Sequence, residues 1–329
     1  MTTEWISRNH RGLQSICESK QVTLSTHWGA DADGLGSALA LRSGLATLGI
    51  RAKVIIPNPL FRRVAFLDWN QEVEVWHQES AASKWMAESD LVVLLDTTSL
   101  GTHEELGQAV ERSKLPIVSI DHHLGESSEL DIVAPDAAAT GEMVYHILRV
   151  LDVDLTEDMA SWLFASISSD TCSFRFVRGR AETFRMAATL IEAGADPWRI
   201  QEGLYQSVST DTPKLFSRAC ERMKLISDGK VVLVWLEAGV LDDLSLDRDD
   251  HRDLIQFLIA QEGVQAAVTV TERDEGDFKL SFRGRKGMNL QPIAKSFGGG
   301  GHAQACGATV AIDGATLQEQ LITKLAHIG

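Results

Sequence analysis

The chain has 329 residues, of which 44% are apolar, and a formal net charge of −15. This length exceeds what one hydrophobic core usually organises, so we expect two domains, and the apolar content excludes global disorder. The acidic charge argues against a protein that tracks along long duplex nucleic acid, because such proteins present a broad basic surface. An anionic ligand should therefore be small and held by a few local cations or by bound metal.

The sequence also argues against a membrane protein and a disulfide scaffold. No apolar run approaches the roughly 18 residues that cross a bilayer, and residues 1–20 are polar and unlike a signal peptide. The four cysteines are scattered without a CxxC pair, which argues against a disulfide framework or a zinc knuckle. We therefore expect a cytoplasmic protein with no membrane partner.

The first two-thirds of the chain alternate strand and helix patterns. An opening helix over about 5–19 precedes a strand over 22–26, and a helix over 35–48 follows. Further strands are expected over 51–56, 72–76, 91–95 and 116–120, and further helices over 140–150, 157–168 and 181–193. The run 91–95 is continuously apolar, which is typical of a parallel strand covered on both faces. We therefore expect an α/β domain over 1–195 with a doubly wound, mostly parallel sheet.

The pattern restarts after a helical segment over 196–226, which we interpret as a linker. Strands are expected over 231–237, 264–272, 278–283 and 307–312, and helices over 252–261, over 291–296 and at the C-terminus. The segment between the second and third of these strands has the composition of a hairpin turn. We therefore expect a second, smaller α/β domain over 227–329 with a mixed sheet.

Three expected strands of the first domain end in ionisable residues. They are followed by His27, Asp31 and Asp33, by Asp96, and by Asp121, His122 and His123, respectively. The carboxyl ends of parallel strands meet at one edge of a sheet, where open α/β sheets bind their ligands, so these side chains should converge. Taken alone, the first loop could equally be a helix cap formed by Asp33 or Ser37. The recurrence at three strand ends favours a metal site.

These residue types suit a pair of divalent cations. Such a pair needs about four carboxylates and two imidazoles, and it activates a water while neutralising a phosphoryl group. The chain offers this set as His27, Asp31, Asp33, Asp96, His122 and Asp170, the last from the expected loop 168–172. Ligands without Cys favour Mn²⁺ or Mg²⁺, with Co²⁺ also accepted.

Two neighbours of this set have other expected roles. Asp121 should orient an adjacent side chain, and His123 should face the substrate as a phosphate donor or general acid, with a purely structural histidine as its alternative. Three cations, Arg175, Arg178 and Arg180, follow Asp170 closely enough to line the site or could equally be solvated.

A second anion-binding pattern lies near the C-terminus. Gly298 to Gly301 are four successive glycines, followed by His302. Glycine lets backbone N–H groups approach an anion closely, and Arg283 offers a bidentate fork for a phosphate. A flexible turn is the alternative interpretation of the glycines.

This combination of motifs resembles the DHH phosphoesterase superfamily. The motifs are His27-x3-Asp31-x-Asp33, Asp96 after an apolar strand, Asp121-His122-His123, Asp170-Thr171 and Gly299-Gly300-Gly301-His302, and residues 139–142 (Ala-Thr-Gly-Glu) also match. Each motif alone is weak, whereas five in the expected order are very specific. The glycine–histidine motif looks like the DHH-associated domain. Size and layout are most similar to short-oligonucleotide phosphodiesterases (nanoRNases), some of which also act on 3'-phosphoadenosine 5'-phosphate.

The resemblance implies a role for each residue. His27, Asp31 and Asp96 would hold one ion, and Asp33, Asp96, His122 and Asp170 the other, so that Asp96 bridges. His123 would contact the scissile phosphate. In the second domain, Arg283 and the loop Gly299, Gly300, Gly301 and His302 would hold the terminal phosphate and nucleotide of the substrate.

The implied reaction is the hydrolysis of RNA of two to five nucleotides to nucleoside 5'-monophosphates. Hydrolysis of 3'-phosphoadenosine 5'-phosphate, of linear or cyclic dinucleotides, or of pyrophosphate or polyphosphate would use the same metals. A catalytically silent nucleotide sensor is the alternative from another class. The polarity of attack, the physiological metal and the oligomeric state, including a homodimer, stay open.

Overall fold

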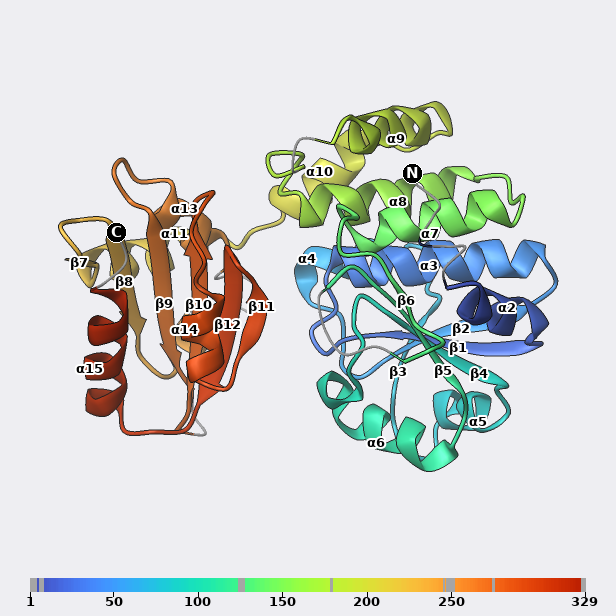
Figure 1. The fold of residues 1–329 in the computed structure, drawn as a ribbon, viewed down its shortest axis with the longest axis horizontal. Coiled ribbons are helices and arrows are strands. Elements are labelled where there is room, and N and C mark those ends of the chain that lie inside the picture. Colours follow the sequence, from blue (N-terminus) through green and yellow to red (C-terminus); the bar gives the residue numbers. More distant parts are fainter. Residues whose placement is uncertain are drawn as a thin grey trace. The chain divides into compact units, whose positions relative to one another are not determined.

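The computed structural model describes residues 5, 9–123, 128–177, 180–244, 246, 252–273 and 276–326. The chain divides into two compact units, Met1–Ser207 and Val208–Gly329 (Figure 1). Within the described residues, each unit has one six-stranded sheet. No described helix has the length and apolar character needed to cross a membrane.

The sheet of the first unit is entirely parallel. Its strands are β1 (Gln21–Thr26), β2 (Arg51–Ile56), β3 (Val73–Val75), β4 (Leu91–Leu95), β5 (Ile117–Asp121) and β6 (Ile132–Val133), in the order β3-β2-β1-β4-β5-β6. Every residue of β1 and β4 is buried, which explains the continuous apolar run in β4. The predicted doubly wound sheet is confirmed.

Helices cover both faces of this sheet. In chain order the helices of this unit are α2 (His10–Glu18), α3 (Ala32–Thr47), α4 (Arg62–Ala65), α5 (Ala81–Ala87), the 3₁₀ turn η1 (Leu100–His103), α6 (Glu104–Ser113), α7 (Thr140–Val150), α8 (Glu157–Asp170), α9 (Ala181–Glu192) and α10 (Pro197–Tyr205). Figure 1 shows α5 and α6 on one face and α3 and α7 on the other, with α8 as a further layer on α3 and α7. The sequence patterns predicted neither α5 nor α6.

The strand order reverses between β1 and β4. From β1 the chain crosses over through α3 to β2, whereas from β4 it crosses over through α6, on the opposite face, to β5. Such a switch point leaves a crevice at the carboxyl ends of the two strands. His27 and Asp96 directly follow these two ends.

Helix α3 begins three residues earlier than the sequence predicts. Its N-cap is Asp31, whose carboxylate accepts hydrogen bonds from the backbone N–H groups of Asp33 and Gly34 (3.1 and 3.2 Å). The alternative caps, Asp33 and Ser37, are therefore wrong. Gly34 is required for packing on β1, because a Cβ there would lie 2.0 Å from Thr26 Oγ1. Asp33 therefore lies in the first turn of α3.

The second unit has the predicted mixed sheet. Its strands are β7 (Lys224–Ile226), β8 (Val231–Leu236), β9 (Ala266–Glu272), β10 (Phe278–Gly284), β11 (Gly300–His302) and β12 (Ala305–Val310), in the order β11-β12-β10-β9-β8-β7. Only the β8–β9 pair is parallel among these described strands. The predicted linker over 196–226 contains α10, α11 and β7, and the division between the units falls between the two helices.

Two helical layers bury this second sheet. The helices of the unit are α11 (Thr212–Glu221), α12 (Val240–Asp243), α13 (Arg252–Ile259), α14 (Gln291–Ser296) and α15 (Gly314–Leu325). One core joins the sheet to α14 and α15, and the other joins it to α11, α12 and α13. Phe282 belongs to the first core, so its neighbour Arg283 projects toward the α13 face.

Candidate metal centre

His27 and Asp31 form one side of the cluster at the end of β1. The His27 Nδ1 atom lies 2.9 Å from the Trp28 carbonyl oxygen, and the tautomer that donates there directs a lone pair of Nε2 at the carboxylates. This Nε2 atom lies 3.8 Å from Asp31 Oδ1 and 3.6 Å from Asp96 Oδ2. Burial disfavours the imidazolium, but the attraction of the Asp31 and Asp96 carboxylates outweighs it and raises the pKa of His27 well above its usual value.

Asp96 lies between two imidazoles. Its Oδ2 faces His27, and its Oδ1 lies 3.5 Å from His122 Nε2. The residue directly follows β4 with a φ of 63°, a left-handed conformation that is uncommon for a side-chain-bearing residue and recurs at functional sites. Thr140 Oγ1 donates a hydrogen bond to Oδ1 (3.0 Å). One carboxylate is therefore shared by both halves of the cluster.

His122 faces three carboxylates at nearly equal distances. Its Nε2 atom is 3.6 Å from Asp33 Oδ2, 3.5 Å from Asp96 Oδ1 and 3.6 Å from Asp170 Oδ2. These separations are too long for hydrogen bonds, and they are slightly wider than the about 3.0–3.4 Å between two atoms that ligate one ion at about 2.1 Å. The donor set and its spacing therefore fit a divalent cation on each side of Asp96. All ligand atoms within the groups His27–Asp31–Asp96 and Asp33–Asp96–His122 lie within 4.8 Å of one another.

Asp33 is the most buried carboxylate of the cluster, with 1% of its side chain exposed. It accepts hydrogen bonds from the backbone N–H groups of Thr140 (2.9 Å) and Gly141 (3.1 Å) and from Ser166 Oγ (2.6 Å). Burial, followed by repulsion from Asp96 and other nearby carboxylates, raises the pKa of Asp33 well above its usual value. A bound cation would relieve this unfavourable charge.

Asp170 is the last residue of α8 and does not lie in the predicted loop. The following residues Cys172, Ser173 and Phe174 all have left-handed backbone angles, with φ of 50°, 57° and 63°. Each such residue costs about 1–2 kcal/mol, and strain of this kind persists only where the surroundings enforce it. Here Ser173 N donates to the Ser168 carbonyl (2.7 Å), which turns the chain sharply after Asp170. Burial and nearby Asp96 raise the pKa of Asp170, although His122 opposes this shift.

Asp121 and His123 form a separate pair beside the cluster. Asp121 Oδ1 accepts hydrogen bonds from the backbone N–H (2.9 Å) and Nδ1 (2.8 Å) of His123. Burial opposes charge on His123, but Asp121 and the nearby Asp96 outweigh it and raise its pKa to about 9. The same contact outweighs the effect of burial on Asp121 and lowers its pKa.

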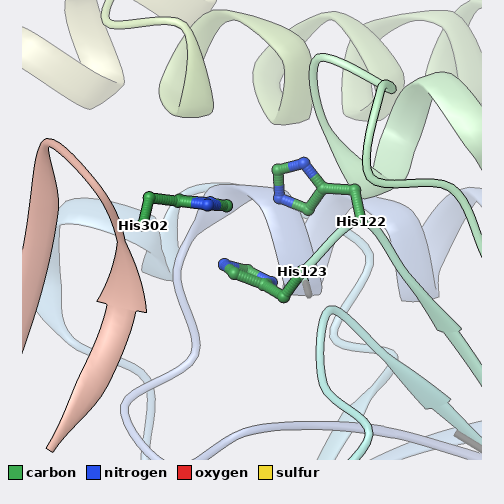
Figure 2. A group of neighbouring side chains, drawn as sticks. All are labelled: His122, His123 and His302. Atoms are coloured by element: carbon green, nitrogen blue, oxygen red, sulfur yellow. The ribbon is translucent and has the colours of Figure 1, made fainter. Parts of the chain in front are cut away.

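The two histidines differ in access. Figure 2 shows the rings of His122 and His123 side by side after β5, and their centroids are 4.6 Å apart. The His122 side chain is fully buried, whereas 38% of the His123 side chain is exposed. His302, also labelled in Figure 2, belongs to β11 of the second unit.

The sequence-derived site residues of the second unit share one row of its sheet. Arg283 on β10 is paired with Ala305 on β12, which is paired with His302 on β11. Paired residues in an antiparallel sheet present their side chains on the same face, and two strand spacings amount to about 10 Å. In the amide orientation that satisfies both groups, Gln256 accepts from Nε (3.2 Å) and a terminal nitrogen (3.1 Å) of Arg283.

The glycine run is part turn and part edge strand, because Gly298 lies in the turn after α14 whereas Gly300 begins β11. Gly300 to His302 pair with β12, and a Cβ on Gly299 would lie 2.0 Å from the Gly307 carbonyl oxygen. Gly301 has a φ of 116°, which favours glycine. Close backbone packing therefore accounts for part of this glycine content.

The structure thus brings all six predicted metal ligands together in the first unit and places Asp121 and His123 beside them. Sequence reasoning missed Thr140 and Ser166, which bind Asp96 and Asp33. The matching segment 139–142 was the available signal for Thr140. Of the three cations after Asp170, Arg175 is exposed, Arg180 pairs with Glu142 (3.2 Å), and Arg178 lies outside the described residues.

Comparison with known proteins identifies the family. The model of the DHH family N-terminal domain matches residues 21–167, and that of the DHHA1 domain matches residues 212–326. The chain is 30% identical over 293 residues to the bifunctional oligoribonuclease and PAP phosphatase NrnA of Thermus thermophilus, which covers 88% of this chain and 84% of the relative. The chain belongs to the DHH family.

Two further similarities extend this comparison. The cyclic-di-AMP phosphodiesterase GdpP of Bacillus subtilis is 29% identical over 342 residues, which cover 97% of this chain, but the chain spans only 49% of that relative. The crystal structure of an exopolyphosphatase-related protein from Bacteroides fragilis has a TM-score of 0.87 and 21% identity, with 97% of this chain and 96% of that chain covered. This last likeness concerns the fold.

Proposed function

We propose that this DHH-family phosphoesterase is a metal-dependent phosphodiesterase that hydrolyses RNA of two to five nucleotides to nucleoside 5'-monophosphates. The observation that carries the proposal is the position of Asp96. Its two carboxylate oxygens face different imidazoles, His27 at 3.6 Å and His122 at 3.5 Å. This is the arrangement expected of a carboxylate that bridges two cations.

We assign one cation to His27, Asp31 and Asp96 and the other to Asp33, Asp96, His122 and Asp170. Oxygen and imidazole donors without thiolates favour Mn²⁺, with Mg²⁺ and Co²⁺ as further occupants. When bound, the pair would activate a water and neutralise charge on the phosphoryl group. The ligand separations given above support this assignment.

The residues around the cluster have distinct tasks in the reaction. Asp121 orients the His123 ring through Nδ1 and stabilises its positive charge. We assign the His123 Nε2–H group to a phosphate oxygen, where an imidazolium stabilises the charge of the transition state. Thr140 and the N–H groups at the start of α7 hold Asp96 and Asp33 in place.

The second unit supplies the proposed substrate-binding residues. Arg283 can bind a terminal phosphate bidentately, and Gln256 restricts its guanidinium. His302 shares its sheet row, and the edge strand at Gly300 to His302 offers backbone groups to a nucleotide. The relative named as an oligoribonuclease supports a short RNA as the substrate.

The direct test is hydrolysis of 5'-labelled RNA of two, three, five and twenty-four nucleotides with Mn²⁺. We expect the short RNAs to give nucleoside 5'-monophosphates, with little product from the longest. Asp96→Asn is the matched variant, because it keeps the side-chain volume and removes the charge. Intact short RNA with the wild-type chain, or equal activity in the variant, would contradict the proposal.

The named relatives favour two alternative substrates. NrnA is described as acting on PAP, and GdpP as acting on cyclic-di-AMP. All of these substrates would use the same cluster, so the cluster itself does not distinguish them. The rates of hydrolysis of PAP, cyclic-di-AMP, linear diadenylate and pyrophosphate at equal concentration would identify the preferred one. A sensor is disfavoured by the complete ligand set, and it would bind the panel without hydrolysing any member.

A further inference from the structure

Residues 136–141 comprise the end of the connection between β6 and α7 and the first two residues of α7. This segment, the loop 136–141, contacts the proposed metal centre from one side. Its Ala137 carbonyl oxygen lies 3.3 Å from His122 Nδ1. A proton on Nδ1 is donated to this carbonyl, which leaves the Nε2 lone pair for the carboxylate side of the ring. The position of Ala137 therefore sets both the tautomer and the tilt of His122.

The same loop holds two of the carboxylates. The Thr140 backbone N–H donates to Asp33 Oδ2 (2.9 Å), its hydroxyl donates to Asp96 Oδ1 (3.0 Å), and the Gly141 N–H donates to Asp33 Oδ1 (3.1 Å). These N–H groups start α7, so the positive end of the helix also faces Asp33. A displacement of this loop would move three of the proposed ligands at once.

Glu142 holds the loop 136–141 in place through a backbone hydrogen bond and an ion pair. The N-cap of α7 is Ala139, which has no side-chain acceptor, and Glu142 instead accepts a hydrogen bond from the Ala138 N–H (3.0 Å). Its other carboxylate oxygen lies 3.2 Å from an Arg180 guanidinium nitrogen, and Arg180 also donates to the Asp136 carbonyl. The first and third residues of the loop are thus fastened by one ion pair.

The carboxylate of this ion pair is costly to bury, although the Arg180 side chain is 29% exposed. The Glu142 side chain is 3% exposed, and a buried carboxylate requires a charged or hydrogen-bonded partner. Two apolar side chains could fill the same volume without that desolvation, but they could not bind the Ala138 N–H and the Asp136 carbonyl together. The contacts of the pair therefore point to the geometry of the loop as its purpose.

We propose that Arg180 and Glu142 are positioning residues for the metal centre. They fix the loop 136–141 so that it orients His122, Asp33 and Asp96 for cation binding. This inference rests on the metal centre of the proposed function. Within the described residues, the Arg180 guanidinium bonds to the Glu142 carboxylate and the Asp136 carbonyl and not to a proposed ligand.

The experiment measures Mn²⁺ binding to the metal-free, full-length chain by titration calorimetry. Arg180→Gln and Glu142→Gln should each weaken Mn²⁺ binding by about 10-fold or more, the range typical of residues that orient ligands. Arg180→Lys keeps the charge but loses the bidentate contact, so its Mn²⁺ affinity should lie between those of the wild type and Arg180→Gln. The matched control is Arg42→Gln, which breaks the ion pair of Arg42 with Glu72 (2.7 Å) in the same unit.

The thermal midpoint of each metal-free variant separates positioning from folding. We expect Arg42→Gln to lower stability without changing the Mn²⁺ affinity, whereas Arg180→Gln should change the affinity. If Arg180→Gln does not fold, Arg180→Lys provides the test instead, and we expect it to bind Mn²⁺ at least about threefold more weakly than the wild type. An Mn²⁺ affinity within twofold of the wild type in the folded Arg180 and Glu142 variants overturns the inference.

The outcomes also separate this inference from the proposed function. A wild-type chain that binds two Mn²⁺ ions but leaves short RNA intact contradicts only the proposed substrate. A wild-type chain that binds no Mn²⁺ overturns both proposals.

Discussion

The two units assemble their proposed functional residues by different structural means. In the first unit, parallel strands end at one edge, so residues that follow β1, β4 and β5 converge although they are distant in sequence. In the second unit, antiparallel register places Arg283 and His302 in one row. The first arrangement suits a compact, charged cluster, and the second suits a spread of polar groups along a ligand. We therefore assign chemistry to the first unit and substrate selection to the second.

The largest effect should come from Asp96→Asn in the first unit. Residues that only orient ligands typically contribute 10–100-fold, so loss of a bridging ligand should reduce kcat by more than about 100-fold. We expect KM to change much less, because binding of the RNA terminus is assigned to the other unit. Steady-state kinetics on a 5'-phosphorylated dinucleotide with Mn²⁺ checks this, and an unchanged kcat would contradict the assignment.

Arg283→Gln in the second unit should show the opposite pattern. Loss of a charged hydrogen-bonded contact costs about 1.5–3 kcal/mol, which predicts a rise in KM of about 10-fold or more with a smaller change in kcat. The same dinucleotide without its terminal phosphate is the control substrate and should be insensitive to the change. An equal loss with both substrates would show that Arg283 does not bind that phosphate.

The Asp121–His123 pair predicts a pH effect in the first unit. The pKa of His123 is raised from an ordinary 6.5 to about 9, and that of Asp121 is lowered from an ordinary 3.8. In the metal-free chain the pair's contribution to stability is therefore complete between pH 3.8 and 6.5, and it is lost as the pH rises through about 9. Asp121→Asn should lower this pKa toward 6.5 because the largest favourable contact is removed. NMR titration of the His123 ring measures both values, and an unchanged pKa in the variant would contradict the pairing.

The smallest effect is expected at the left-handed turn after Asp170. Cys172 has a φ of 50°, and glycine adopts this conformation without the Cβ penalty. Cys172→Gly should stabilise the chain by up to about 1 kcal/mol, whereas Cys172→Ser, which keeps Cβ, should not. Thermal unfolding of the metal-free variants tests this, and equal midpoints for the two variants would show that the turn is unstrained.

The convergence of the proposed ligands could be predicted from the sequence better than the elements around them. His27, Asp96 and His122 follow strands whose apolar patterns are local, so their meeting point follows from the rules of parallel sheets. The predicted start of α3 was wrong because several polar residues in this segment could cap the helix, and only the folded structure selects Asp31. Asp170 was placed in a loop because a helical pattern does not indicate its own last turn.

The contacts that hold the proposed ligands could not be predicted from spacing. Ser166 binds Asp33 across 133 positions, and Arg180 reaches Asp136 across 44. Such contacts depend on the packing of helices against one another. The glycine run was ambiguous for a related reason, because the strand pairing at Gly300 to His302 depends on a partner strand.

The central claim is that Asp96 bridges two divalent cations, and electron paramagnetic resonance of the Mn²⁺-loaded chain tests it most directly. Two Mn²⁺ ions that share a carboxylate should give an exchange-coupled spectrum at a stoichiometry of two per chain, and Asp96→Asn should abolish the coupling. A spectrum of isolated Mn²⁺ ions in the wild type, or coupling that persists in Asp96→Asn, would contradict the account.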